Sequence, residues 1–339
     1  MNFEHQGIPT NDHDRKEITA MNFDFEGVNV NSYNRVAGET DDAGRIQRAV
    51  DDNPNGVVVF PEGVYEIGKT INIKNRCSLK LAKNAKLLCV AEMEYILDWD
   101  GGKEMFFHDY GMFITGGTID GAALSGGIKL QNIHHLTMRD IWFKDCKTGL
   151  RVGNKDDLRN YELVANNLYF RNEVGIADSV GVDLYSHGDH YFDSIVVVDY
   201  QTGFHINSYA TFMSKCHSWV SNIVPDLDKT IGYDLDESAL WVTLSDCYVD
   251  TAKIGVRIKG KCCRMSNVFG YQNTIYGGRE HTFLSYESDS PFSLQGGTFV
   301  GRKGYDDSFF KGNYTGKVYM QDVYCDSLKD TEILELCKK

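Results

Sequence analysis

Charged side chains recur at one position of a repeated sequence pattern. The pattern is a glycine followed by an apolar, a polar and a second apolar residue, and it starts at Gly127, Gly149, Gly181, Gly203, Gly232 and Gly255. Its polar position holds Lys129, Arg151, Asp183, His205, Asp234 and Arg257. The position two residues later holds Gln131, Gly153, Tyr185, Asn207, Asp236 and Lys259. If the six segments lie side by side, these side chains form one charged patch.

Three aspartates in this patch suggest cleavage of a glycosidic bond. That reaction needs one carboxylic acid to protonate the leaving oxygen and a second carboxylate to activate water or attack the sugar. Asp183 and Asp234 would be two strands apart, about 9–10 Å, and Asp234 and Asp236 about 6.5–7 Å apart. Both separations favour inversion over retention of configuration. We therefore predict that Asp183, Asp234 and Asp236 are catalytic, with Glu237 as a further acid if the strand bends there.

The other polar side chains of the patch would bind the substrate. His205 would lie between Asp183 and Asp234, and two carboxylates favour its charged form. We assign the same role to Arg257, Lys259, Tyr185 and Asn207, and to His187 and Trp241 nearby. Trp241 and Tyr209 could stack on a sugar, whereas the apolar strand pattern around Trp219 predicts that Trp219 lies in the core.

A metal ion is not expected. His187 and His190 flank a Gly-Asp pair, but two histidines in a loop without a third ligand do not complete a site. We therefore expect no metal and no cofactor.

The glycine repeats also predict the fold. Successive glycines are 22, 32, 22, 29 and 23 residues apart, and each unit carries a second strand, such as the one that begins at Leu136, Phe192 or Val242. A coil of about 22 residues cannot bury its inner face alone, so neighbouring coils must stack. The alternative is a β-sandwich, but sandwich strands do not share one phase over six repeats. The repeats predict an all-β, single-stranded parallel β-helix.

An N-terminal helix is expected to cap this stack, because an open end would expose core and strand edges. Thr40 would cap a helix over about 40–52, with Ile46, Ala49 and Val50 on its buried face. Residues 1–20 are polar and aperiodic and predict a flexible arm. Residues 21–339 would form one domain, with coils over about 57–327.

Two segments resemble a known superfamily. Glu39-Thr-Asp-Asp-Ala-Gly-Arg-Ile-Gln-Arg-Ala-Val and Gly56-Val-Val-Val-Phe-Pro-Glu-Gly-Val-Tyr-Glu-Ile look like the N-terminal signature of pectate-lyase-like β-helix proteins. That superfamily includes polygalacturonase-type glycoside hydrolases, inulin fructotransferases and phage tailspikes, and the resemblance implies a right-handed helix. Arg257-Ile258-Lys259 is similar to the Arg-Ile-Lys motif with which those hydrolases grip a sugar carboxylate. Their Asn-x-Asp, Asp-Asp and Gly-His-Gly motifs do not follow one another here.

The leading hypothesis is a glycoside hydrolase acting on an oligo- or polysaccharide. A polysaccharide lyase with Arg257 or Lys259 as base, or a fructotransferase, remains open on the same fold. A non-catalytic glycan-binding or tailspike-like module is the alternative of a different class. The resemblance to tailspikes and fructotransferases implies a homotrimer.

The composition and the length of the apolar runs indicate which kinds of partner and location to expect. The 35 Lys and Arg residues against 48 Asp and Glu residues give a net charge of −13, which argues against nucleic acid as a partner. No apolar run approaches the ~18 residues of a membrane span. The N-terminus has no apolar signal segment, so we expect a cytoplasmic protein, or a secreted one if a signal was removed. The nine cysteines lack paired spacing and are expected in the core.

Overall fold

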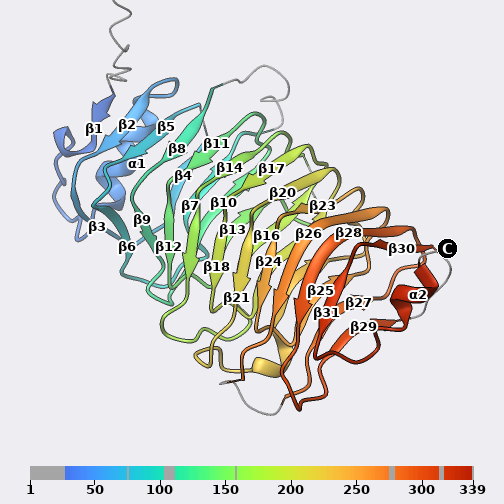
Figure 1. Cartoon of the computed structure of the whole chain (residues 1–339). Helices are drawn as coiled ribbons and strands as arrows, with labels where there is room; N and C mark the ends of the chain where they lie inside the picture. The colour runs from blue at the N-terminus through green and yellow to red at the C-terminus, as the bar shows by residue number, and fades with distance from the viewer. Residues whose placement is uncertain are drawn as a thin grey trace, which may run out of the picture.

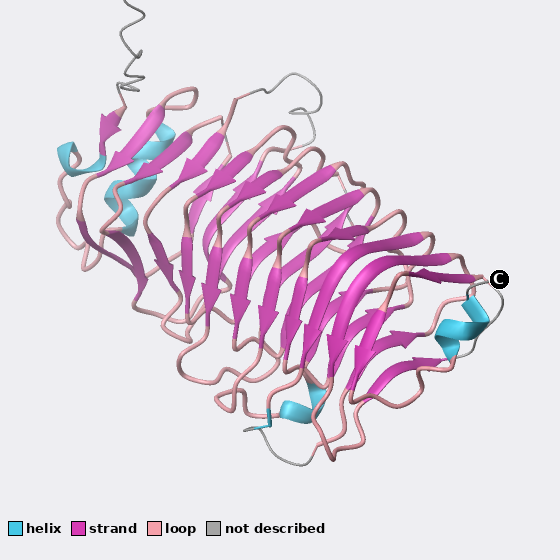
Figure 2. Ribbon diagram, viewed as in Figure 1, coloured by secondary structure: helices cyan, strands magenta, loops and turns pink. Residues whose placement is uncertain are grey.

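The chain winds into stacked coils of parallel strands. The computed structural model describes residues 27–74, 76–102, 111–156, 159–274, 279–312 and 317–337, so the predicted arm lies outside the described residues. Figures 1 and 2 show the coils following one another along a single axis, with the described N-terminal residues at one end and the C-terminus at the other. Every strand pairing among the described residues is parallel, and each links one coil to the next along the chain. The predicted all-β parallel helix is confirmed.

The coils present three faces. We call the first the charged face, and its ten strands pair in chain order. They are β4 (Ile71–Ile73), β7 (Tyr95–Asp100), β10 (Gly126–Gln131), β13 (Thr148–Val152), β16 (Val180–Ser186), β19 (Thr202–Ser208), β22 (Ile231–Leu235), β25 (Ile254–Ile258), β27 (Thr282–Tyr286) and β29 (Ser308–Gly312).

Two further ladders complete the helix and join through the long strands β26 and β28. The second face holds β1 (Val28–Asn29), β2 (Val57–Phe60), β5 (Ser78–Leu81), β8 (Phe113–Thr115), β11 (Thr137–Arg139), β14 (Val164–Asn166), β17 (His190–Asp193), β20 (Thr211–Ser214), β23 (Thr243–Ser245), the start of β26 (Cys263–Tyr271), the start of β28 (Phe292–Val300) and β30 (Val318–Gln321). The third, which we call the aromatic face, holds β3 (Gly63–Ile67), β6 (Ala85–Cys89), β9 (Thr118–Asp120), β12 (Trp142–Lys144), β15 (Tyr169–Arg171), β18 (Val196–Val198), β21 (His217–Trp219), β24 (Tyr248–Asp250), the ends of β26 and β28, and β31 (Tyr324–Asp326).

The core is a column of apolar side chains inside the coils. Because strands alternate their side chains, the middle residue of each short strand points inward and stacks on its counterpart in the next coil. Phe143 and Phe170 stack with ring centroids 4.4 Å apart, and Phe204 and Tyr233 with centroids 4.8 Å apart. Six of the eight cysteines whose burial is described are buried in this core, and none forms a disulfide there; Cys262 and Cys325 are half-buried.

The repeated glycines stand in register on the inner side of the charged face. A Cβ atom on Gly232 would lie 2.6 Å from the carbonyl oxygen of Gly255 and 2.4 Å from a methyl carbon of Val249. Gly149 and Gly203 would make the same kind of contact with the carbonyl of the glycine in the next coil. No side chain larger than hydrogen fits there unless the backbone moves. The glycine repeat is therefore a packing requirement of the stacked coils.

The corners between faces use left-handed backbone conformations. At the corner after the charged face, six residues from successive coils have φ between 42° and 59°: His135, Glu162, Asp189, Ala210, Trp241 and Cys262. At the corner between the second and aromatic faces, Asp and Asn dominate, as at Asp140, Asn167, Asp246 and Asn267. Asp and Asn tolerate this conformation better than other residues do. The corners therefore place equivalent side chains one above another.

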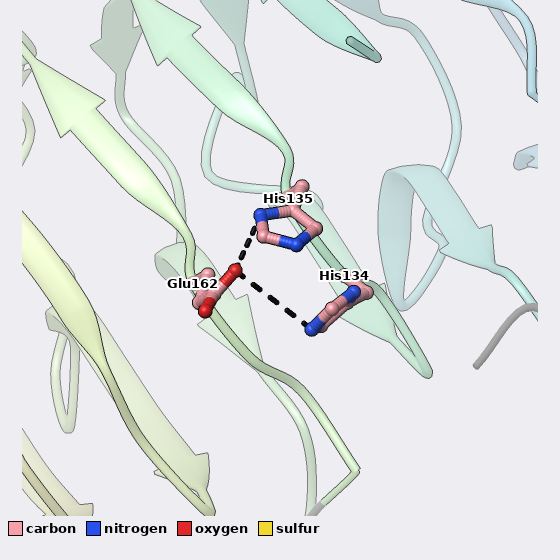
Figure 3. Close-up of side chains that lie close together, drawn as sticks. All are labelled: His134, His135 and Glu162. Carbon is pink, nitrogen blue, oxygen red and sulfur yellow. Dashed lines mark ion pairs between the residues drawn. The ribbon is translucent and has the colours of Figure 1, made fainter. Parts of the chain in front are cut away.

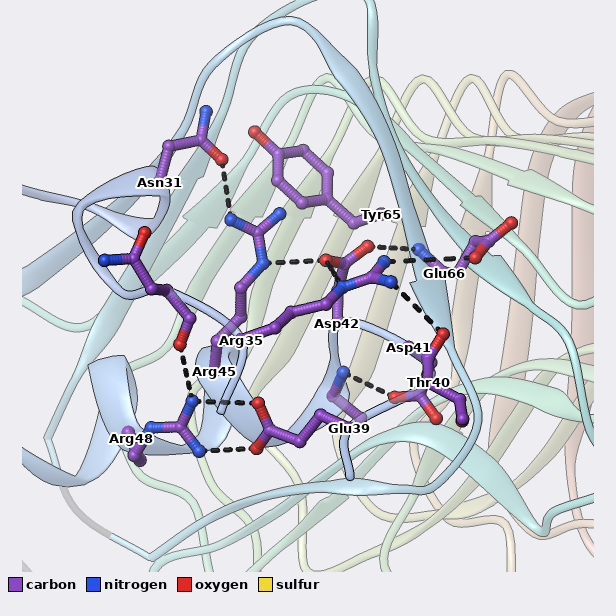
Figure 4. Close-up of polar contacts among 12 residues, drawn as sticks. Asn31, Arg35, Glu39, Thr40, Asp41, Asp42, Arg45, Arg48, Tyr65 and Glu66 are labelled. Atoms are coloured by element: carbon purple, nitrogen blue, oxygen red, sulfur yellow. Dashed lines mark hydrogen bonds and ion pairs between the residues drawn. The ribbon is translucent and has the colours of Figure 1, made fainter. Parts of the chain in front are cut away.

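The N-terminal helix is α1 (Ala43–Asp51), and it buries Ile46, Ala49 and Val50 as predicted. The predicted cap at Thr40 is wrong, because the residue that precedes the helix is Asp42. The Asp42 carboxylate accepts hydrogen bonds from Arg45 (2.7 Å) and from the backbone N–H of Glu66 (2.8 Å) (Figure 4). The helix is thereby fastened to β3.

Three short helices accompany these elements. A 3-10 turn, η1 (Val30–Ser32), precedes α1, and a second, η2 (Leu227–Lys229), precedes β22. At the other end, α2 (Ile333–Cys337) packs beside β30 and buries Ile333. Both ends of the described stack thus carry a helix. Among the described residues, no helix has the length and apolar character needed to cross a membrane.

Candidate functional site

The predicted charged patch exists as a column on the outer side of the charged face. The register pairs Lys129 with Arg151, Arg151 with Asp183, Asp183 with His205, His205 with Asp234 and Asp234 with Arg257. Asp98 precedes Lys129 in the same column, and Ser285 follows Arg257. Tyr185 and Asn207 also pair with each other as expected. The order of the side chains in this column is confirmed. Their catalytic and binding roles remain predictions.

Besides the ion pair of Lys129 with Asp98 (3.5 Å), the outward side chains of this face contact one another in two groups. In the first, Arg151 donates to Asp183, whose Oδ1 lies 2.7 Å from Nδ1 of His205. The other ring nitrogen of His205 lies 3.3 Å from Asp236, which also accepts a bond of 3.3 Å from Lys259. In this way the acids and bases of successive coils form one continuous chain of ion pairs.

The second group is a two-pronged pair between Arg257 and Asp234. The Nε of Arg257 donates to Oδ1 of Asp234 at 2.8 Å, and Nη2 donates to Oδ2. Parallel bonds of this kind are among the strongest that a carboxylate forms. Only 7% of the Asp234 side chain is exposed, against 25% for Arg257. Both Asp183 and Asp234 are therefore paired with an arginine and are only 7% exposed, which suits positioning better than proton donation.

His205 and Asp236 have shifted pKa values of opposite direction. Burial lowers the pKa of His205, but its hydrogen bond to Asp183 and the surrounding carboxylates outweigh burial, so the net pKa is raised. Burial raises the pKa of Asp236, but a backbone hydrogen bond from Glu237, the contact with His205 and the charge of Lys259 outweigh it, so the net pKa is lowered. The pair is therefore favoured as imidazolium and carboxylate.

The arginines of the column are poor candidates for a catalytic base. The hydrogen bond to Asp234 raises the pKa of Arg257 further above its ordinary value. An arginine held in this way keeps its proton at every pH at which proteins fold. Arg151 also lies over the ring of Tyr185, with its guanidinium carbon 4.3 Å from the ring centroid, which fixes both side chains.

Glu237 lies on the turn that follows β22, and Asn207 bonds to the backbone of this turn. The backbone N–H of Ala239 bonds to the carbonyl of Asp236 at 2.8 Å, so residues 236–239 form a turn, and Asn207 accepts a bond of 3.1 Å from the N–H of Ser238. Glu237 is exposed on this turn. The chain therefore turns directly after Asp236, and Glu237 is exposed next to it.

The remaining predicted residues lie at the corner after the charged face. Trp241 is 56% exposed in a left-handed conformation. His187 stacks on Tyr161, with centroids 5.8 Å apart and planes at 14°, and meets Tyr209 edge to face. His190 is fully buried, bonded to Ser186 and to the N–H of Leu163, and burial lowers its pKa to about 3. His190 is therefore structural, and these residues flank the charged column instead of entering it.

Sequence reasoning missed the aromatic face. Its strands place one outward residue per coil in register, and this column consists of Thr118, Trp142, Tyr169, Val196, His217, Tyr248, Phe269, Thr298 and Tyr324. His217 stacks on Tyr248 with centroids 4.2 Å apart. Trp219 was predicted in the core, but it is half-buried in the neighbouring outward column. The sequence signal for this column is the alternation of inward and outward residues in the later strands of each repeat, which were not aligned with one another from coil to coil.

Known proteins resemble the chain in structure. No protein-family model matches the chain, and no curated protein matches its sequence. Similar solved structures include the surface adhesin PfbA of Streptococcus pneumoniae, with a TM-score of 0.56, 15% identity and coverage of 89% of this chain and 92% of that chain. The gp42 tailspike of Acinetobacter phage vb_AbaP_AS12 has a TM-score of 0.58 at 11% identity, and the match covers 89% of this chain and 61% of that chain. The endo-xylogalacturonan hydrolase of Aspergillus tubingensis has a TM-score of 0.50 at 13% identity, with coverage of 87% of this chain and 91% of that chain.

The chain is a right-handed parallel β-helix. Its neighbours are proteins of the pectate-lyase-like type, as the N-terminal signature implied. They include a hydrolase, an adhesin and a tailspike. The chain spans under two thirds of the tailspike's length. At these identities the likeness concerns the fold alone, and the function of this β-helix depends on its own side chains.

Proposed function

We propose that this β-helix binds a polysaccharide across its charged face and cleaves it by acid–base catalysis centred on Asp236. The observation that carries the proposal is the contrast among the predicted carboxylates. Asp183 and Asp234 are each held by an arginine and are 7% exposed, whereas 27% of the Asp236 side chain is open to solvent. Of the three aspartates predicted to be catalytic, Asp236 is therefore the one most open to a substrate.

Asp236 suits the role of base or nucleophile. Its lowered pKa keeps it ionised at neutral pH, so it can accept a proton from water or attack a sugar carbon. Glu237, exposed on the adjoining turn, is the proposed proton donor. His205 and Lys259 would hold Asp236 in place, while Asp183 and Asp234 fix the bases around it.

The test is a panel of plant, microbial and fructan glycans, incubated with wild type, Asp236→Asn and Glu237→Gln. Asp193→Asn is the matched control, because Asp193 is an outward, partly exposed aspartate near a lysine on the second face. We expect the release of reducing ends to fall about 100-fold or more in Asp236→Asn and to persist in the control. Cleavage that survives Asp236→Asn, or that falls equally in Asp193→Asn, contradicts the proposal. A product that absorbs in the ultraviolet would identify a lyase instead.

Glycan binding without cleavage is the second candidate, and the aromatic face favours it. Trp142 and Phe269 are 42% and 38% exposed in one column, and exposed rings provide stacking surfaces for sugars. If this is the function, a glycan of the panel should bind without being shortened. Trp142→Ala with Phe269→Ala should then weaken binding, and Asp236→Asn should not.

A further inference from the structure

A cluster of metal-ligand type lies outside the charged column. His134 and His135 follow β10, and Glu162 precedes β14 in the next coil. A parallel bridge joins His134 to Tyr161, and the N–H of His135 bonds to the carbonyl of Tyr161 at 3.3 Å, so Glu162 is brought beside the two histidines (Figure 3). Side chains from two successive coils thus converge at the corner between the charged and second faces.

The donor atoms of the three side chains are close together. One ring nitrogen of His134, one of His135 and a carboxylate oxygen of Glu162 all lie within 4.8 Å of one another. Glu162 Oε2 contacts His135 Nδ1 and lies 3.8 Å from His134 Nε2. A tetrahedral zinc ion would separate its ligand atoms by roughly 3.3–3.5 Å, from metal–ligand bonds of about 2.0–2.2 Å. The 3.8 Å between Glu162 and His134 is close to this separation, and no pair of donor atoms is more than 4.8 Å apart.

The surroundings hold the histidines while leaving one side accessible. The His134 side chain is 9% exposed, His135 27% and Glu162 38%. The rings of His134 and His135 lie 4.0 Å apart, and Tyr161 packs edge-on against His134 at 5.8 Å. His187 in turn stacks on Tyr161. The enclosed histidine is restrained by its neighbours, and the more exposed ligands face solvent.

We propose that His134, His135 and Glu162 bind a divalent transition-metal ion, with zinc as the expected occupant. Two imidazoles and one carboxylate are the donors that zinc prefers, whereas calcium and magnesium prefer sites made of oxygen alone. Three protein ligands leave a fourth position for water or for a ligand oxygen. Among the described residues this is the one group that combines these donor types at such distances. The site does not depend on the proposed glycan cleavage.

The left-handed backbone at His135 and Glu162 does not by itself indicate the metal, because other coils have the same conformation at this corner. Its effect is to point successive side chains in one direction, one coil apart. The next coil has Asp189 at the equivalent position, and the following coils have Ala210 and Trp241. Asp189 is also a carboxylate, but among the described residues only the two histidines and Glu162 bring their donor atoms within 4.8 Å of one another.

The experiment measures binding of Zn²⁺ by calorimetry and of Co²⁺ by its visible absorption, using chelator-treated full-length protein. His135→Ala and Glu162→Gln are the main variants, because these side chains are partly exposed and their loss leaves the core intact. His217→Ala is the matched control, since His217 is a half-buried histidine on the aromatic face and is not one of the three ligands. We expect one ion per chain for wild type and His217→Ala, and at least tenfold weaker binding for the other two variants.

Two results would overturn the proposal. One is that wild type binds the metal ion no more tightly than His135→Ala does. The cluster would then be an ordinary ion pair between histidine and glutamate. The other is an equal loss of affinity in His217→Ala, which would show that the loss is not specific to the three proposed ligands. Circular dichroism of each variant shows whether the fold is retained. Cleavage assays with and without Zn²⁺ are separate from this test, so failure of one proposal does not decide the other.

Discussion

Removing the arginine that holds Asp234 should destabilise the β-helix. In Arg257→Met the aliphatic part of the side chain is kept and the guanidinium is lost, so Asp234 loses both of its hydrogen bonds from Arg257. Breaking a fully buried ion pair costs about 3–5 kcal/mol. Arg257 is a quarter exposed, so solvent screens part of the effect, and we expect the free energy of unfolding to fall by about 2–3 kcal/mol.

A double-mutant cycle isolates the pair. Asp234→Asn alone should cost less, because the arginine left behind can turn toward water. The double variant should be more stable than the sum of the single effects predicts, with a coupling of about 1–2 kcal/mol. Unfolding in urea, followed by circular dichroism with a check for reversibility, measures each value. Lys215→Met removes an exposed partner of Asp193 and should leave the midpoint unchanged. Additive effects in the cycle, or a loss below about 0.5 kcal/mol in Arg257→Met, would refute the reasoning.

Two further predictions concern packing and pH. Gly232→Ala should lower the free energy of unfolding by about 2–3 kcal/mol, because its Cβ would overlap the carbonyl oxygen of Gly255 in the next coil. The control is Gly56→Ala, whose Cβ meets nothing closer than 3.4 Å and which should unfold at nearly the same urea concentration as wild type. Equal urea midpoints for the two variants would contradict the packing argument. His205 has a raised pKa in the folded state, so its contribution to stability is fully present below the ordinary histidine pKa of about 6.5 and is lost as the pH rises through the folded-state value. The stability difference between wild type and His205→Gln should therefore be larger at about pH 5.5 than at about pH 8.5, and a difference that is constant or grows with pH would exclude the proposed charge.

The fold and the order of the charged column could be predicted because one glycine per coil sets the phase. Once Gly181, Gly203 and Gly232 are aligned, the period of two fixes which residues point outward. Contacts between side chains could not be predicted in the same way. His205 bonds to Asp183 and Asp236 and not to its direct neighbour Asp234, because Asp234 is already held by Arg257.

The cluster of His134, His135 and Glu162 could not be predicted from the sequence for a different reason. His135 and Glu162 are aligned only after the segment between β13 and β14 is given its correct length, and the glycine spacing does not fix where inserted residues fall. Trp219 was misplaced because its neighbours Ser218 and Val220 are the buried residues of that segment, so the phase of the strand is shifted by one from the predicted one. A shift of one residue exchanges the inner and outer faces.

The alternation of charge along the charged face has a consequence for how the coils find their order during folding. Backbone hydrogen bonds between parallel strands are the same whichever coil is the neighbour, so they cannot prevent a strand from skipping one coil. From β13 to β25 the column has the sequence arginine, aspartate, histidine, aspartate, arginine. With His205 protonated, any skip of one coil within this stretch would place two like charges side by side, which is unfavourable. The alternating charges of the column thus disfavour misaligned strands. Protonated His205 extends this effect to the middle of the stretch from β13 to β25.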